Sequence, residues 1–238
     1  MGKFESNSLQ GSVGNLIFYN VNGVTYARTK PAKRKPKRGE PESQQVTAFT
    51  TVSKYGTPII MALKKEIPFP IGRAVYSQVR GWMLNQWKLI QSGGVTGIGM
   101  ESTPMFQLNK EVDIRNCLLL LPKIEQVKDG ILFKFPSMIP VKHIRAPKDT
   151  KHVFIKMIVL ASSFSRQDEG VQVSNVLYSI PFNKTALAPA DFTVPLHAEE
   201  GDVTVVAIGL SYENSTGQFF NEAIWQPVAL IAMGKWQL

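Results

Sequence analysis

Cysteine is almost absent from this chain of 238 residues, in which Cys117 is the only one. A single cysteine excludes a disulfide bond within the chain, so the cysteine content gives no sign of an oxidising compartment. No stretch reaches the ~18 uninterrupted apolar residues that a membrane-spanning helix needs. The first residues also lack the apolar core of a secretory signal peptide, and we therefore expect a cytoplasmic protein.

Motifs of catalysis, metal binding and cofactor binding are missing as well. The histidines are His143, His152 and His197, and none is paired with another histidine at the spacing typical of metal ligands. The segment 209–211, Gly-Leu-Ser, lacks the second glycine of the turn that exposes a nucleophilic serine in hydrolases. We therefore expect no metal, no cofactor and no enzymatic activity. An enzyme of unrecognised type stays an alternative, because carboxylates from distant parts of a chain can converge in a fold.

The single cysteine and the one glycine-rich segment are both interpreted as structural features and not as functional sites. Cys117 precedes four consecutive leucines, which predicts a buried structural thiol, since a reactive thiolate needs electropositive and partly exposed surroundings. The glycine-rich segment 93–99 follows a predicted helix and has no lysine behind it, unlike a phosphate-binding loop. We interpret this segment as a flexible linker.

Acidic residues are scarce in the first 100 residues, where 14 lysines and arginines accompany 4 aspartates and glutamates. The remaining residues hold 13 basic and 14 acidic side chains, so the net charge of +9 belongs to the N-terminal part. Such an asymmetry indicates an anionic partner, with nucleic acid or an anionic surface first. The candidate contacts to phosphates are seven basic residues: Arg28, Lys30, Lys33, Arg34, Lys35, Lys37 and Arg38.

The same basic segment has two other interpretations. Prolines at positions 31 and 36, set among six positive charges, predict an extended and solvated linker. The segment can equally meet an acidic protein surface. A protein partner or self-association is therefore as open as nucleic acid.

A β-hairpin is predicted just before the basic segment. Two β-prone runs, 15–21 and 24–29, flank Asn-Gly at 22–23, the dipeptide most typical of a two-residue hairpin turn. Such a turn places Tyr19 opposite Tyr26. We expect the two rings to pack across the strands, and stacking on the bases of a single-stranded nucleic acid is the alternative. A lone hairpin is marginal in water, so this one must dock on another surface.

Two helices are predicted between the basic segment and residue 92. The first runs from about residue 40 to 65, with a kink or split at 56–58, Gly-Thr-Pro. The second runs from 71 to 90 and has a broad apolar face that includes Trp82 and Trp87. The short proline-containing connection between them indicates a helical hairpin.

Strands predominate after residue 99. Turn residues separate seven β-prone runs that have no helical stripe between them, which predicts an antiparallel immunoglobulin-like β-sandwich. The runs are residues 118–121, 131–135, 153–161, 173–180, 192–196, 203–212 and 224–233. The run 203–212 is apolar on both faces and should lie at the centre of a sheet. Pro227 should place the last run at an edge or a bulge.

The expected fold is therefore mainly β with a helical N-terminal part. It places a β-hairpin and two helices beside an immunoglobulin-like antiparallel β-sandwich. The expected domain boundary separates the basic hairpin and helical hairpin, 1–92, from the sandwich, 93–238. Whether the helices pack on the sandwich is left open.

The opening of the chain combines Gly14-Asn15, Tyr19, the Asn-Gly turn and an Arg-x-x-Pro sequence that begins at Arg28. A lysine-rich stretch and the first predicted helix follow. This order resembles the opening of a family of uncharacterised proteins from Bacteroidetes. The resemblance covers about residues 10–65 and implies a β-rich C-terminal part similar to immunoglobulin-like sandwiches. It implies no activity, no cofactor and no catalytic residue.

These observations together predict a non-enzymatic binding or structural module. Binding of nucleic acid through residues 28–38 is the first alternative, and an enzyme of unrecognised type is the second.

Overall fold

The computed structural model describes residues 3–5, 8–21, 24–30, 44–94, 98, 104–164 and 170–237. The chain forms two compact units, residues 1–41 and 42–238. The boundary between the units thus falls after residue 41, whereas we expected a domain boundary after residue 92. The reason for the difference is that both long helices share a hydrophobic core with the strands that follow them.

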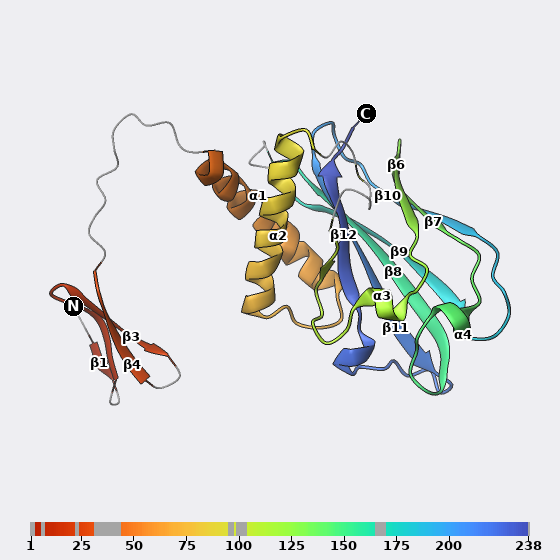
Figure 1. Ribbon diagram of the computed structural model, residues 1–238, viewed down its shortest axis with the longest axis horizontal. Helices are drawn as coiled ribbons and strands as arrows, with labels where there is room; N and C mark the ends of the chain where they lie inside the picture. The colour runs from red at the N-terminus through yellow and green to blue at the C-terminus, as the bar shows by residue number, and fades with distance from the viewer. Residues whose placement is uncertain are drawn as a thin grey trace. The chain divides into compact units, whose positions relative to one another are not determined.

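The N-terminal unit is a four-stranded antiparallel sheet in which each strand pairs with the next along the chain (Figure 1). Its strands are β1 (Lys3–Glu5), β2 (Ser8–Val13), β3 (Leu16–Val21) and β4 (Val24–Thr29). The predicted hairpin is present as β3 and β4, with Tyr19 opposite Tyr26. Its turn at 22–23 lies outside the described residues. The strands β1 and β2 were not predicted.

The second unit contains two antiparallel sheets. The larger sheet has the strand order β5-β12-β11-β8-β9, and the smaller has the order β10-β7-β6. The larger sheet comprises β5 (Phe106–Gln107), β8 (Thr150–Ser162), β9 (Gln172–Pro181), β11 (Val203–Asn214) and β12 (Val228–Lys235). The smaller comprises β6 (Lys123–Val127), β7 (Gly130–Phe135) and β10 (Ala190–Pro195). The protein is thus mainly β, as expected, and β11 is central, as its apolar run predicted.

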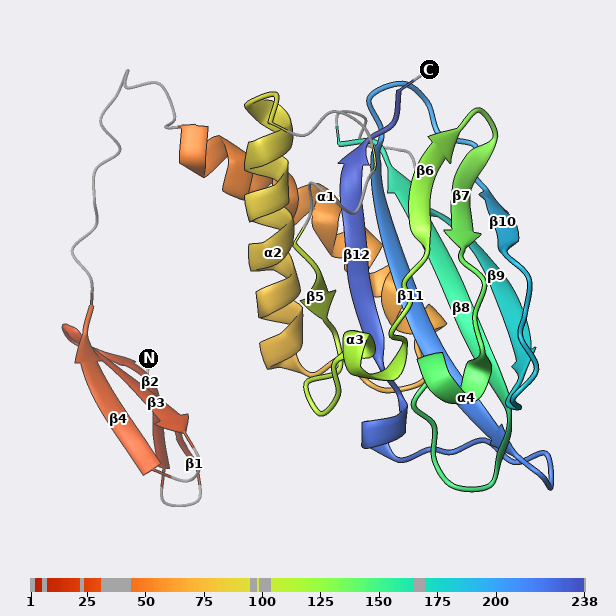
Figure 2. The same cartoon turned by 45° about the vertical axis from the view of Figure 1, so that its right-hand side comes forward.

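Two long helices, α1 (Gln44–Glu66) and α2 (Arg73–Gln91), lie against the outer face of the larger sheet. Helices, larger sheet and smaller sheet make three layers in the second unit (Figure 2). The central strands β8 and β11 are therefore buried on both faces over most of their length, which explains their continuous apolar runs. In β8, Met157 and Val159 face the smaller sheet, whereas Ile158 and Leu160 face the helices.

We predicted a kink or a split at 56–58. The helix α1 passes through Pro58 without a break, so there is no split. Proline within a helix removes one backbone hydrogen bond and costs about 3 kcal/mol. Ile59 and Ile60, the next two residues, are buried in the core between helix and sheet, and this burial offsets the cost. The Thr57 hydroxyl also donates a hydrogen bond to the carbonyl oxygen of Ser53 at 2.7 Å.

The predicted strand at 118–121 is wrong as well. A short helix, α3 (Ile114–Cys117), precedes it, and Asp113 caps this helix by accepting a hydrogen bond from the Arg115 amide at 2.8 Å. Within 118–121, only Leu118 makes a β-bridge, to Ile144 just after α4 (Pro140–His143). The leucine run therefore forms an irregular segment after the helical turn.

The last predicted strand begins later than expected. A 3₁₀ turn, η1 (Ala223–Trp225), occupies the start of the run 224–233, and β12 begins directly after Pro227. Proline has no amide hydrogen for the ladder, so it precedes the strand instead of interrupting it. The strand β12 is not an edge, because β5 pairs with its outer side. Its pairing with β11 does shift register between Leu230 and Ala232, so the last run contains a bulge or irregularity, at a position other than Pro227.

Candidate binding surface

The hairpin of the N-terminal unit brings aromatic and basic side chains together. The rings of Tyr19 and Tyr26 stack across the strands with centroids 5.7 Å apart, and the Arg28 guanidinium carbon lies 5.8 Å from the centroid of Tyr19. Residues opposite one another in an antiparallel pair share a face. We call the group formed by Ile17, Tyr19, Tyr26 and Arg28 the tyrosine face.

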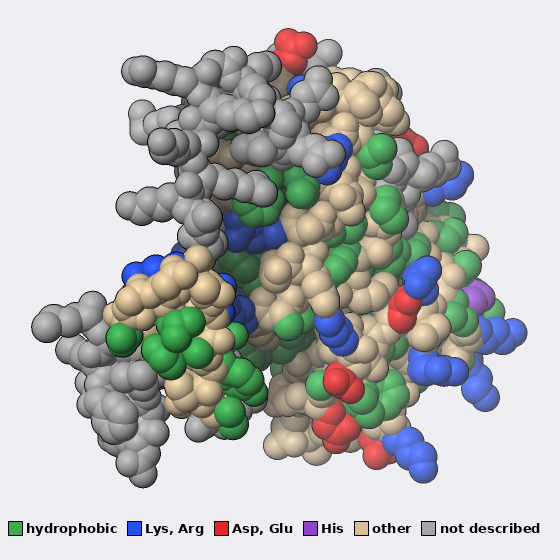
Figure 3. Space-filling view, turned by 60° about the vertical axis from the view of Figure 1, so that its left-hand side comes forward, with side chains coloured by type: hydrophobic (Ala, Val, Ile, Leu, Met, Phe, Trp, Pro, Cys, Tyr) green, Lys and Arg blue, Asp and Glu red, His purple; other side chains and the backbone are tan. Residues whose placement is uncertain are grey.

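The tyrosine face is open to solvent. Tyr19 is 41% exposed and Tyr26 is 46% exposed. None of the described side chains of this unit, residues 11–20 and 24–30, is buried. Hydrophobic side chains accordingly lie on the surface of the unit (Figure 3). The rings thus pack across the strands, as expected, and their outer surfaces remain available to a partner.

The basic segment leaves this sheet at a defined point. The Lys30 amide donates a hydrogen bond to the Asn15 carbonyl oxygen at 2.8 Å, and the Lys30 ammonium group donates to the Gly14 carbonyl oxygen at 2.9 Å. Gly14 has a φ of +57°, a conformation that glycine adopts without strain. The start of the basic segment is therefore fixed to the turn between β2 and β3.

Of the predicted phosphate contacts, the structure places Arg28 next to Tyr19, whereas Lys30 lies at the turn between β2 and β3, at the far end of the hairpin from the Asn-Gly turn. The remaining predicted contacts lie outside the described residues: Lys33, Arg34, Lys35, Lys37 and Arg38. The exposure of the tyrosines had no signal in the sequence, because strand alternation shows which side chains share a face but not whether that face is covered.

The three histidines lie in separate places. His143 Nδ1 accepts a hydrogen bond from the Ile139 amide at 2.9 Å, and His152 Nδ1 lies 3.2 Å from a carboxylate oxygen of Glu213. His197 lines a cavity elsewhere. Among the described residues, no three metal-ligating side chains gather into one group.

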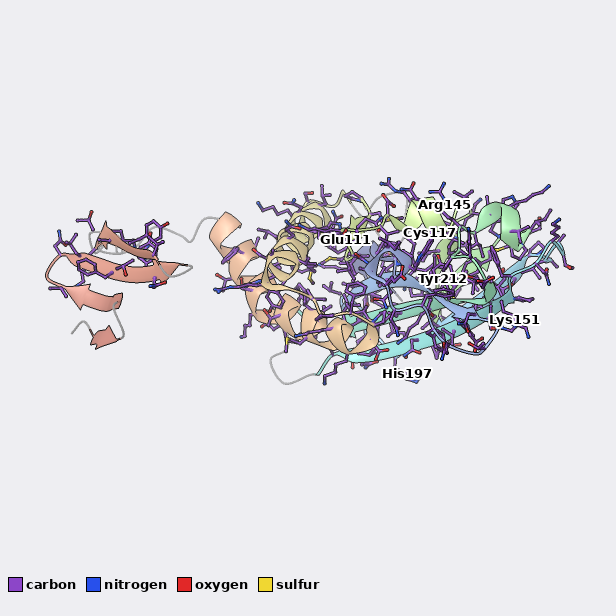
Figure 4. All side chains as sticks on the ribbon, turned by 90° about the horizontal axis from the view of Figure 1, so that it is seen from below. Glu111, Cys117, Arg145, Lys151, His197 and Tyr212 are labelled. Carbon is purple, nitrogen blue, oxygen red and sulfur yellow. The ribbon has the colours of Figure 1, made fainter. Side chains whose placement is uncertain are left out.

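Cys117 is buried, as the leucines after it predicted. Burial raises the pKa of the Cys117 thiol, which a hydrogen bond with Tyr212 partly opposes. Burial also raises the pKa of Tyr212, whose hydroxyl donates a hydrogen bond to the carbonyl oxygen of Arg145 at 3.0 Å. Cys117, Tyr212 and Arg145 lie close together, while Lys151 and His197 lie apart from them (Figure 4). The thiol is therefore protonated at neutral pH and belongs to the core.

Native Cys117 should resist thiol reagents at pH 8. A raised pKa lowers the fraction of reactive thiolate, and a reagent must wait for the core to open. With a free energy of unfolding of about 5 kcal/mol or more, the reaction should be over ~1,000-fold slower than in the denatured chain. The measurement compares the rate of reaction with an aromatic disulfide in buffer and in concentrated denaturant. A native rate within about tenfold of the denatured rate would show that Cys117 is accessible.

A cavity of about 700 Å³ lies at one end of the two sheets. Its lining combines charged and polar groups, among them Lys128, Asp129 and His197. The carboxylate of Asp202, another lining residue, accepts a hydrogen bond from the Glu199 amide at 2.9 Å and so stabilises the turn before β11. The volume is within the range of small-molecule sites.

Comparison with known proteins finds no matching family model, no matching curated protein and no matching solved structure. The resemblance to the Bacteroidetes family therefore stays a prediction. In the described part of the chain, every helix is too short or too polar to cross a bilayer.

Proposed function

We propose that this protein is a non-enzymatic binding module whose N-terminal unit binds nucleic acid. The observation that carries the proposal is the exposed Tyr19–Tyr26 stack, beside Arg28, on a sheet with no buried side chain among its described residues 11–20 and 24–30. The chain leaves this sheet directly into the basic segment 30–38.

Charge supports nucleic acid as the partner. Residues 1–41 hold eight lysines and arginines but only two acidic side chains. Each basic residue that neutralises a phosphate releases a bound counterion, and this release makes binding favourable at low salt.

The tyrosines add a contact that an acidic protein surface would not need. Aromatic faces stack on unpaired bases, with about 1–3 kcal/mol per base, and accept any base because every base has a π-face. Arg28 can stack beside them while its charge meets a phosphate. The arrangement therefore fits a single strand better than a duplex, whose bases are already stacked on one another.

For the second unit we propose the immunoglobulin-like class of sandwich. In the nomenclature of that class, β6, β7 and β10 take the places of strands A, B and E, which pair in the order A-B-E. The strands β8, β9, β11 and β12 take the places of C, C′, F and G, in the order G-F-C-C′. The short β5 and the two covering helices are additions to this plan. The assignment concerns the fold alone and implies no function.

The test of the proposed function is a titration of labelled single-stranded and double-stranded DNA and RNA across a salt series. With up to seven phosphate contacts and a slope of about −0.7 per contact, single-strand affinity should fall roughly 1,000-fold between ~50 and ~200 mM salt. A variant with all seven candidate residues changed to alanine should lose most of this binding and most of the salt dependence. The residues are Arg28, Lys30, Lys33, Arg34, Lys35, Lys37 and Arg38.

The matched control removes seven exposed lysines from the second unit. These are Lys110, Lys123, Lys128, Lys142, Lys148, Lys151 and Lys184, each changed to alanine. Because the control changes the net charge equally, it should retain affinity close to that of the wild type. Equal losses in the two variants, or no wild-type binding at ~50–100 mM salt, would contradict the proposal.

A double variant, Tyr19→Ala with Tyr26→Ala, examines the stacking contact. It should bind single strands about tenfold or more weakly, because about 1–3 kcal/mol is lost for each unstacked base. Duplex binding, which depends on the phosphates, should remain nearly unchanged.

A further inference from the structure

The strand β9 ends the larger sheet, and no other described strand pairs with its outer edge. It is ten residues long, and only Ile180 among these residues is buried. The opposite edge of the same sheet is β5, with two residues. The sheet therefore has one short edge and one long, exposed edge.

The sequence of β9 leaves this edge without protection. Natural proteins blunt exposed edges with charged side chains, with proline, or by keeping the edge strand short. Residues 172–181 contain no charged side chain, and their proline is the last residue. Uncharged segments of high β-propensity aggregate when they stay exposed. An edge of this kind consequently needs a partner strand.

Apolar side chains of β9 extend this open surface. Leu177 lies opposite Lys156, and Val173 lies opposite Leu160, which packs against the helices. Both β9 side chains therefore belong to the helix-covered face of the sheet. They are nevertheless exposed, Leu177 to 54%.

The last residue of α1 contacts Asn175, which lies between Val173 and Leu177 on β9. Glu66, the last residue of α1, places a carboxylate oxygen 2.8 Å from the Lys156 ammonium group and 3.0 Å from the side-chain amide of Asn175. The end of α1 thus contacts β9 at Asn175, while Val173 and Leu177, on either side of Asn175 on the same face, stay exposed.

We propose that β9 forms a homodimer interface by pairing antiparallel with β9 of a second copy of this chain. The uncharged sequence of β9 favours a second copy, because two uncharged strands bring no like charges together, whereas a charged partner would find no counter-charge on β9. An antiparallel pair has a two-fold axis, so the same strand serves on both sides.

Pairing about this two-fold axis accounts for the unpaired backbone edge of β9 and for its exposed apolar side chains. The backbone groups of the two edges become hydrogen-bonded, and the larger sheet continues from one copy into the other. An axis perpendicular to the sheet keeps the helix-covered faces on one side, so Val173 and Leu177 of both copies form one apolar strip. The interface is closed, since both copies use the same edge, and β5, the other described edge of the larger sheet, has only two residues. It does not depend on nucleic-acid binding by the N-terminal unit.

The test is the molar mass of the full chain, measured by light scattering and by sedimentation equilibrium. At roughly 10–100 µM, where a micromolar interface is populated, we expect twice the chain mass of 26.5 kDa. Leu177→Lys should shift the mass to that of the monomer, because it places two ammonium groups beside the axis. Leu119→Lys is the matched control: Leu119 is 58% exposed on a different segment, and this variant should remain a dimer.

Circular dichroism and the unfolding midpoint show whether the Leu177→Lys chain is folded. If it is not, Val173→Lys places the same charge on the same strip and serves as the second variant. Protection of β9 amides from hydrogen exchange that rises with protein concentration would support the proposal. A wild-type monomer across the whole concentration range would overturn it. A dimer that persists in a folded Leu177→Lys or Val173→Lys chain would overturn it as well.

Discussion

Replacing Ile60 with aspartate is expected to unfold the second unit at 25 °C. Ile60 is 1% exposed and lies in the core between α1, α2 and the larger sheet. A buried carboxylate without a partner costs several kcal/mol, and about 2–3 kcal/mol of apolar burial is lost with the isoleucine. A domain is stable by only about 5–15 kcal/mol, so the sum removes most or all of its stability. The measurement is a urea titration followed by circular dichroism and tryptophan fluorescence.

The control is the neighbouring residue of the same helix. Met61 is 51% exposed, so Met61→Asp should change the free energy of unfolding by about 1 kcal/mol or less. The pair of variants also decides where the domain boundary lies. If residues 93–238 folded without the helices, Ile60→Asp would keep the β-sheet signal and its cooperative transition. We expect both to be lost together, because one core joins α1 to β8, β11 and β12.

Gly130→Ala is expected to destabilise the second unit by about 3 kcal/mol or more, at the upper end of overpacking effects. A Cβ atom at Gly130 would overlap the carbonyl oxygen of Val194 and lie 3.1 Å from the Cα of Pro195. These are backbone atoms of β10, whose pairing with β7 sets their position. Relief requires the two strands to separate, so the substitution breaks the smaller sheet at this point. The urea midpoint should fall sharply.

Gly81→Ala provides the comparison for this substitution. Gly81 lies inside α2, is exposed, and has no atom within 4 Å of the position where its Cβ would lie. Alanine loses less conformational entropy in a helix than glycine, so this variant should be more stable by roughly 0.5–1 kcal/mol. Equal effects of the two substitutions would show that β7 and β10 are not in close contact at Gly130.

Short-range features of the chain were predictable from its sequence. The Asn-Gly turn and its flanking β-prone runs determined the register that places Tyr19 opposite Tyr26. The apolar stripe around Trp82 predicted α2, and the double-sided apolar run 203–212 predicted a central strand. Each of these depends on contacts within one element or across one tight turn, where the local pattern dominates the energy.

Elements whose structure depends on distant partners were mispredicted or missed. Pro58 remains within α1 because Ile59 and Ile60 pack against strands some 100 residues further along the chain. The leucine run 118–121 is continuously apolar and still forms no strand. The pairing of β5 with β12 joins segments over 100 residues apart, and no pattern within β5 indicates it.

The tyrosine face and the β9 edge were also predictable only in their local features. The sequence by itself determined the concentration of positive charge before residue 41, the cross-strand tyrosines, and the absence of charge from residues 172–181. Only the tertiary structure decided that the tyrosine face is uncovered, that β9 lies at the end of its sheet, and that Val173 and Leu177 stay exposed there. Composition and side-chain alternation are local properties of a chain. Strand order and coverage of a face result from the competition of all apolar surfaces for burial, which is resolved only when the whole chain is packed.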